Sequence, residues 1–144
     1  MSYLPAGTPL PQPTPDDQAY WDFIRQRQLR IQRCTYCARF RHPPMPNCPS
    51  CRSASAEWAA VSGNGEVFSY TIVRHAAHPA LKTALPFNVA VVMLDDAGDV
   101  RLVSNVVDAS HEEMRIGLSV SLVWEATEDG GWLPRFCKRA DATQ

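Results

Sequence analysis

No run of twenty apolar residues occurs in this chain of 144 residues, which excludes an ordinary membrane-spanning helix. The first fifteen residues have neither a basic start nor an apolar stretch of signal-peptide length. The sequence also lacks a glycine-rich phosphate loop, a Gly-x-Ser-x-Gly nucleophile elbow and a His-Glu-x-x-His metalloprotease motif. We therefore expect a cytoplasmic protein that carries no recognisable catalytic motif of its own.

Acidic residues are absent between Asp22 and Glu57, although the formal net charge of the whole chain is only −1. The same region holds seven arginines: Arg25, Arg27, Arg30, Arg33, Arg39, Arg41 and Arg52. The basic segment has four open interpretations: a solvated face, an anion site, a surface for an acidic partner, or a nucleic-acid contact. The pI of about 6.4 argues against nucleic acid, because nucleic-acid-binding domains are usually basic.

The first third of the chain predicts an arm, a helix and a strand. Residues 1–15 contain five prolines and little to bury, which indicates an extended arm that gains order against a partner. An apolar stripe with i, i+3, i+4 spacing, behind an acidic first turn, predicts a helix over residues 16–28. Alternation of apolar and polar residues predicts a strand over residues 29–34.

Strand patterns dominate the second half of the chain. They predict strands over residues 66–75, 87–94, 99–107, 118–126 and 132–136. Turn residues separate these segments at short intervals, which indicates a small β-barrel that is closed or nearly closed. The longest irregular stretch, residues 76–86, is rich in apolar side chains for a connection. It is either a lid over one end of the barrel or a contact surface.

Four of the five cysteines form two Cys-x-x-Cys pairs separated by ten residues: Cys34, Cys37, Cys48 and Cys51. This spacing is typical of a zinc ribbon, in which four thiolates surround one ion. Zinc is the expected metal, and iron is the alternative that the spacing leaves open. A four-thiolate site has no free coordination position for water or substrate, so its role is structural. Cys137 stands alone and is interpreted as a small, partly buried side chain.

Several sequence segments together resemble one known family. The segments "CTYC", "CPSC", "GEVFSYTIV", "RIGLSVSLVWE" and "LPRF" are similar to the family catalogued as domain of unknown function 35. The resemblance covers residues 16–138. It implies a mainly β fold in which an N-terminal helix and a rubredoxin-like zinc ribbon precede a five-stranded OB-fold barrel. A glycine often follows each cysteine pair in this family, whereas Ala38 and Arg52 occupy those positions here.

The resulting domain boundaries are a Pro-rich arm (residues 1–15), a helix and zinc ribbon (16–60), an OB-fold (61–138) and a short tail (139–144). The resemblance implies a non-catalytic accessory subunit that binds a thiolase-superfamily enzyme, either a thiolase or a CoA-thioester aldolase. Such a subunit helps form the partner's acyl-CoA site, as in lipid or steroid side-chain metabolism.

Within this resemblance, the basic segment has a specific target in the phosphates of coenzyme A, which a few arginines can hold by bidentate contacts. The residues predicted to contact an acyl-CoA thioester are Arg33, Arg39, Arg41, Arg74, His75, His78 and Phe87. The alternative function is an OB-fold protein that binds single-stranded nucleic acid and stacks bases on Phe68 and Tyr70.

Overall fold

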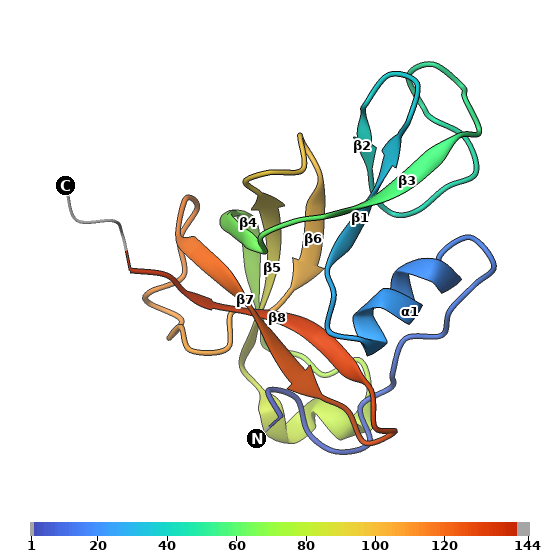
Figure 1. The fold of residues 1–144 in the computed structure, drawn as a ribbon. Coiled ribbons are helices and arrows are strands. Elements are labelled where there is room, and N and C mark those ends of the chain that lie inside the picture. Colours follow the sequence, from blue (N-terminus) through green and yellow to red (C-terminus); the bar gives the residue numbers. More distant parts are fainter. Residues whose placement is uncertain (1, 141–144) are drawn as a thin grey trace.

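A curled five-stranded sheet forms the larger part of the molecule, and a small three-stranded sheet projects from it (Figure 1). The computed structural model describes residues 2–140; the end of the predicted tail, from residue 141 onward, lies outside them. The elements in chain order are α1 (Gln18–Arg25), β1 (Arg30–Cys34), β2 (Phe40–Arg41), β3 (Ala56–Ala60), β4 (Asn64–Val73), η1 (Pro79–Ala84), β5 (Phe87–Leu94), β6 (Arg101–Ser104), β7 (Ser119–Ala126) and β8 (Trp132–Lys138). The prediction of a mainly β protein with one N-terminal helix is confirmed.

Helix α1 lies inside the predicted range of residues 16–28 but is shorter at both ends. It begins after a turn held by the carboxylate of Asp17. It ends where Arg27 adopts a left-handed φ of 55°, which turns the chain out of the helix. Tyr20 and Ile24 are buried, as the apolar stripe predicts.

The small sheet has the order β2-β1-β3, with β1 in the middle. Strand β3 pairs with the whole of β1, from Arg30 opposite Ala60 to Cys34 opposite Ala56. The sequence analysis assigned no strand to residues 56–60, because three alanines around one tryptophan carry no clear alternation. Pairing with β1, rather than local propensity, makes this segment extended.

The large sheet has the order β6-β5-β4-β7-β8, and all its neighbouring strands are antiparallel. A bulge between Val67 and Ser69 bends β4 and lets the sheet curl. The two edges approach each other where Val106, just after β6, forms a parallel bridge with Phe136 of β8. The buried residues on the concave side, including Val67, Val92 and Phe136, form the core. The expected five strands thus form a curled antiparallel sheet, a half-barrel whose edges are joined by this bridge.

Asn88 ties this closure together from inside the barrel. Its side chain is fully buried, accepts the N–H of Val106 at 2.8 Å and donates to the carbonyl of Val106 at 2.8 Å. The bridge to Phe136 uses the backbone groups of Asn105 and Val107, so the Asn88 amide supplies the partners for the N–H and C=O of Val106 itself. Buried backbone groups without such a partner are costly, so this side chain is a structural requirement.

The N-terminal arm lies against the barrel of its own chain, which differs from the expected docking on a partner. The N–H of Tyr3 donates to Glu125 at 3.0 Å, and the Tyr3 hydroxyl accepts the N–H of Asn88 at 3.0 Å. Burial of the Tyr3 ring raises the pKa of its hydroxyl. Proline content alone could not show this anchor, which depends on one aromatic residue near the start of the arm. No helix within residues 2–140 is both long and apolar enough to cross a membrane.

Replacing Asn88 with alanine should destabilise the chain by about 2–5 kcal/mol, because the N–H and C=O of Val106 would both remain buried without partners. The measurement is urea unfolding followed by circular dichroism. Asn64→Ala is the matched control: it removes a partly exposed bond to Ser121 and should cost less than about 1 kcal/mol. Equal losses for the two variants would contradict the role assigned to Asn88.

Candidate metal centre and neighbouring cavity

The two cysteine pairs form two turns with the same hydrogen-bond pattern. In the first, the N–H of Cys34 donates to Arg39 O and the N–H of Ala38 donates to Cys34 O, each at 2.9 Å. In the second turn, the corresponding bonds run from Cys48 to Ser53 and from Arg52 to Cys48, again at 2.9 Å. The repeated geometry is that of two metal-binding knuckles facing each other.

The four sulfur atoms converge on one point. They all lie within 4.8 Å of one another, and the pairs Cys34–Cys51 and Cys37–Cys48 are 3.5 Å apart. A tetrahedron of sulfurs about 2.3 Å from a central ion has edges of about 3.8 Å, so the spacing fits a metal ion. No disulfide joins the cysteines within residues 2–140. The four cysteines are therefore positioned to bind a metal ion, consistent with zinc.

The pKa values of these thiols also favour the binding of a metal cation. Backbone N–H groups of the knuckles lower the pKa of Cys34, through Cys37, and the pKa of Cys48 to about 6, through Cys51. The N–H of Ser53 lowers the pKa of Cys51, but desolvation and the three other sulfurs outweigh it and raise that pKa to about 12. A divalent cation would allow all four to ionise together.

Both knuckles end in a left-handed residue that is not glycine. Ala38 has a φ of 63° and Arg52 a φ of 67°. A side chain in this conformation crowds the backbone, at a cost of roughly 1 kcal/mol or more per residue. The resembled family often has glycine at these two positions, and the left-handed φ gives the physical reason.

The ribbon arginines predicted to contact coenzyme A have different environments. Arg33 forms an ion pair with Glu57 on the neighbouring strand. Arg39 is exposed and donates to Ser50. Arg41 is only 3% exposed, and its guanidinium donates to Gln32 and to the carbonyl of Met45. Burial thus removes Arg41 from any surface that a phosphate could reach.

The other predicted contacts lie at the opposite end of the molecule. Arg74, His75 and His78 are exposed in the connection after β4, which contains η1. Phe87 is only 8% exposed and belongs to the core. In Figure 1 the ribbon stands at the top and the yellow-green η1 segment at the bottom. The two groups therefore do not combine into one anion site within this chain.

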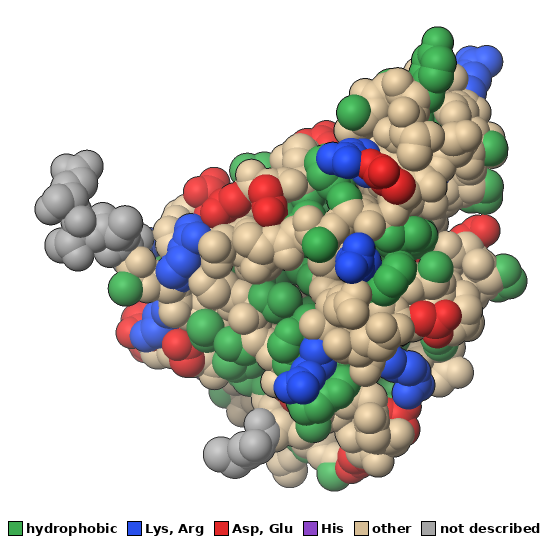
Figure 2. Space-filling view, in the orientation of Figure 1, with side chains coloured by type: hydrophobic (Ala, Val, Ile, Leu, Met, Phe, Trp, Pro, Cys, Tyr) green, Lys and Arg blue, Asp and Glu red, His purple; other side chains and the backbone are tan. Residues whose placement is uncertain are grey.

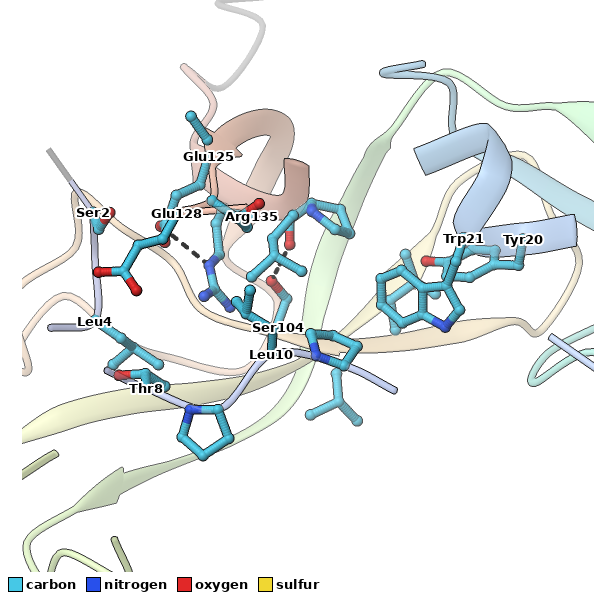
Figure 3. A pocket seen from close by; sticks show the side chains of 18 of the residues that line it. Ser2, Leu4, Thr8, Leu10, Tyr20, Trp21, Ser104, Glu125, Glu128 and Arg135 are labelled. Carbon is cyan, nitrogen blue, oxygen red and sulfur yellow. Dashed lines mark hydrogen bonds and ion pairs between the residues drawn. The ribbon is translucent and has the colours of Figure 1, made fainter. Parts of the chain in front are cut away.

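A cavity of about 540 Å³ lies where the arm, α1, the ribbon and the barrel meet (Figure 3). Its lining includes Leu4 and Leu10 of the arm, Trp21 of α1, and Glu125 and Arg135 of the barrel. None of the residues predicted to contact coenzyme A lines it. The sequence analysis did not predict this cavity. Its walls come from segments more than a hundred residues apart, and no local pattern shows that they meet.

The metal centre and the curled sheet define a protein class, a zinc ribbon followed by an OB-fold. The sequence matches two domain families of this class. Residues 21–57 match "ChsH2, rubredoxin-like zinc ribbon domain", and residues 58–125 match "ChsH2, C-terminal OB-fold domain". A solved structure titled "Ltp2-ChsH2(DUF35) aldolase" contains a chain with 36% identity and a TM-score of 0.80, and the alignment covers 90% of this chain and 98% of that one. The chain belongs to the DUF35 family.

Curated relatives extend the comparison. A probable enoyl-CoA hydratase alpha subunit of Thermomonospora curvata is 39% identical over 83% of this chain, and 3-oxo-4,17-pregnadiene-20-carboxyl-CoA hydratase alpha subunit of Mycobacterium tuberculosis is 30% identical over 83%. This chain spans only 37% and 41% of those two proteins. A "DUF35 domain-containing scaffold protein" of Pyrococcus furiosus is 31% identical over 77% of this chain and 82% of its own length.

Removing the metal with a strong chelator should unfold the ribbon, because so small a sheet buries little apolar surface without it. In a ¹H–¹⁵N NMR spectrum, the dispersed signals of residues 30–60 should collapse while signals from β4 to β8 persist. Readdition of zinc should restore them. A metal-free chain with an intact ribbon spectrum would contradict the structural role of the ion.

Replacing Ala38 or Arg52 with glycine should each stabilise the ribbon by about 1 kcal/mol, because glycine adopts positive φ without strain. Competition with a chromogenic chelator measures the expected gain in zinc affinity. Ala54→Gly, at a position without positive φ, is the control and should show no gain. A gain of the same size in the control would show that left-handed strain is not the cause.

Proposed function

We propose that this chain is a non-catalytic accessory subunit of an acyl-CoA enzyme, in lipid or steroid side-chain metabolism. The match to the DUF35 chain of an aldolase complex, over 98% of that chain, is the observation that carries the proposal. The hydratase and scaffold names of the other relatives support it. The partner is a thiolase-superfamily enzyme such as a CoA-thioester aldolase, and the complex is cytoplasmic.

The ribbon is the surface proposed to meet this partner. It projects from the barrel, and hydrophobic and basic side chains gather at its tip (Figure 2). Tyr36, between the two cysteines of the first knuckle, is 82% exposed. Exposed tyrosine and arginine side chains on a rigid support are the usual anchors of protein interfaces.

Charge favours an acidic partner surface. Residues 29–60 hold five arginines against the single acidic residue Glu57, while the whole chain has a net charge of −1. Arg39 and Arg52 are exposed near the knuckles. A basic projection on an otherwise acidic molecule orients association with an acidic patch. Direct contact of Arg33 or Arg39 with the phosphates of coenzyme A remains part of the proposal, through a site completed by the partner.

The nucleic-acid alternative has one supporting observation. Phe68 and Tyr70 are 44% and 37% exposed, as stacking platforms would be. However, the guanidinium of Arg101 already lies 3.9 Å from the centre of the Phe68 ring, which covers that face. The arginine-rich segment lies on the ribbon rather than around these rings. The accessory-subunit function therefore accounts for more of these structural features than nucleic-acid binding does.

Affinity purification of the tagged chain from its source cells should recover an enzyme whose CoA-thioester turnover depends on the chain. Tyr36→Ala should weaken that complex at least about tenfold, because anchor residues contribute about 2 kcal/mol or more to binding. The measurement is the dissociation constant by calorimetry.

Ile116→Ala is the matched control, because Ile116 is 72% exposed but lies on the barrel, and it should leave affinity unchanged. Recovery of nucleic acid without an acyl-CoA enzyme would favour nucleic-acid binding over the accessory-subunit function. A complex that tolerates Tyr36→Ala would contradict docking through the ribbon tip.

A further inference from the structure

The cavity between arm and barrel has the size of a small-molecule site. Its volume of about 540 Å³ falls among typical ligand pockets, which hold roughly 300–1,000 Å³. Apolar side chains from four separate segments face it, among them Leu10, Trp21, Val103 and Leu133. Figure 3 shows Trp21 and Tyr20 at one end of the cavity, whereas Glu125, Glu128 and Arg135 lie toward the other end.

The arm forms one wall of the cavity and is tied to the rest of the described chain near its two ends. Tyr3 anchors one end of it, and a turn at Thr14 and Asp17 leads into α1 at the other. Within the described chain, no hydrogen bond joins residues 4–13 to any other segment. The wall is therefore held by apolar contact alone over this span, which permits entry of a ligand beneath it.

Arg135 provides the polar recognition group. Its Nε donates to Glu125 at 3.2 Å and its Nη1 donates to Asn105 at 2.7 Å, while Nη2 donates no hydrogen bond to residues 2–140. The Arg135 and Glu125 side chains are only 12% and 13% exposed. The pair holds the guanidinium in place, and one of its nitrogen atoms remains able to donate to a ligand (Figure 3).

The charges around the cavity balance. Arg135 and Arg101 line it together with Glu125 and Glu128. His42 also lines it, and burial lowers the pKa of its imidazole to about 4, so that it is neutral near pH 7. The carboxylates of Glu125 and Glu128 would repel an anionic ligand, and Glu125 already pairs with Arg135. A neutral acceptor at Arg135 would carry no such penalty.

We propose that this cavity binds a neutral, largely apolar small molecule that carries one hydrogen-bond acceptor, such as a ketone, with the acceptor at Arg135. The apolar body lies between the arm and Trp21. This site belongs to the chain itself, so the proposal goes beyond the accessory role and does not depend on the identity of a partner enzyme.

The test uses three probes of matched shape on the full-length, zinc-loaded chain. These are 1-acetylpyrene, which has a neutral acceptor, 1-ethylpyrene, which has none, and 1-pyrenecarboxylate, which is charged. Fluorescence titration gives their affinities, and ¹H–¹⁵N NMR shows whether signals of Leu4, Leu10 and Leu133 shift. The acetyl probe should bind about tenfold more tightly than either of the others, the value of one well-placed hydrogen bond to a charged donor.

Two variants test the position of the ligand. Leu10→Trp should fill the cavity and weaken all three probes at least about tenfold. Ile116→Trp, at an exposed position outside the cavity lining, should weaken none. Arg135→Lys should remove the preference for the acetyl probe over the ethyl probe without weakening the ethyl probe. Absence of binding by 1-acetylpyrene, tighter binding of the carboxylate, or binding unaffected by Leu10→Trp would overturn the proposal.

Discussion

The convergence of four thiolates on one point is the constraint on which the helix-and-ribbon half of the molecule depends. The knuckles fix β1 and the loop that joins β2 to Cys48. Gln32 of β1 then holds that loop through the N–H of Met45 and the buried guanidinium of Arg41. The next residue, His42, packs against Tyr20 of α1 with ring centroids 5.0 Å apart. Through these contacts the ribbon braces one side of α1, whose Tyr20 and Ile24 also pack into the barrel core.

This chain of contacts connects the metal centre to the cavity. Tyr20, Trp21 and His42 all line the cavity, so the metal-bound ribbon supplies one of its walls while the barrel supplies another. The arm, anchored by Tyr3 on the barrel, covers the space between them. The ion has no open coordination position in a four-thiolate site. In the proposed function the ion therefore acts through shape: it would hold a rigid ribbon for a partner and one side of the proposed ligand site.

Sequence patterns predicted the elements whose signals are local. The four cysteines, with their short, regular spacing, predicted the metal centre, and a continuous apolar run predicted β5 with its bounds at residues 87–94. The apolar stripe of α1 predicted its buried Tyr20 and Ile24. In each case the pattern of residue types within one short segment was sufficient for the prediction.

Features that depend on distant partners could not be predicted in the same way. Strand β3 is extended because β1 pairs with it, although its own residues are mostly alanine. The burial of Arg41 follows from the acceptor on Gln32, which no charge count reveals. The cavity needs the arm and β8, at opposite ends of the chain, to meet. The net positive charge of residues 29–60 was visible in the sequence, but its division among paired, buried and exposed arginines was not.

In the proposed function, this chain acts through a partner rather than as an enzyme. The most direct test compares acyl-CoA thioester turnover by the purified, zinc-loaded chain alone, by the copurified partner enzyme alone, and by the two recombined. We expect no turnover by the chain alone and a recombined activity well above that of the partner alone. Turnover by the isolated chain, abolished by a substitution within it, would show that the chain is itself an enzyme and refute the proposed function.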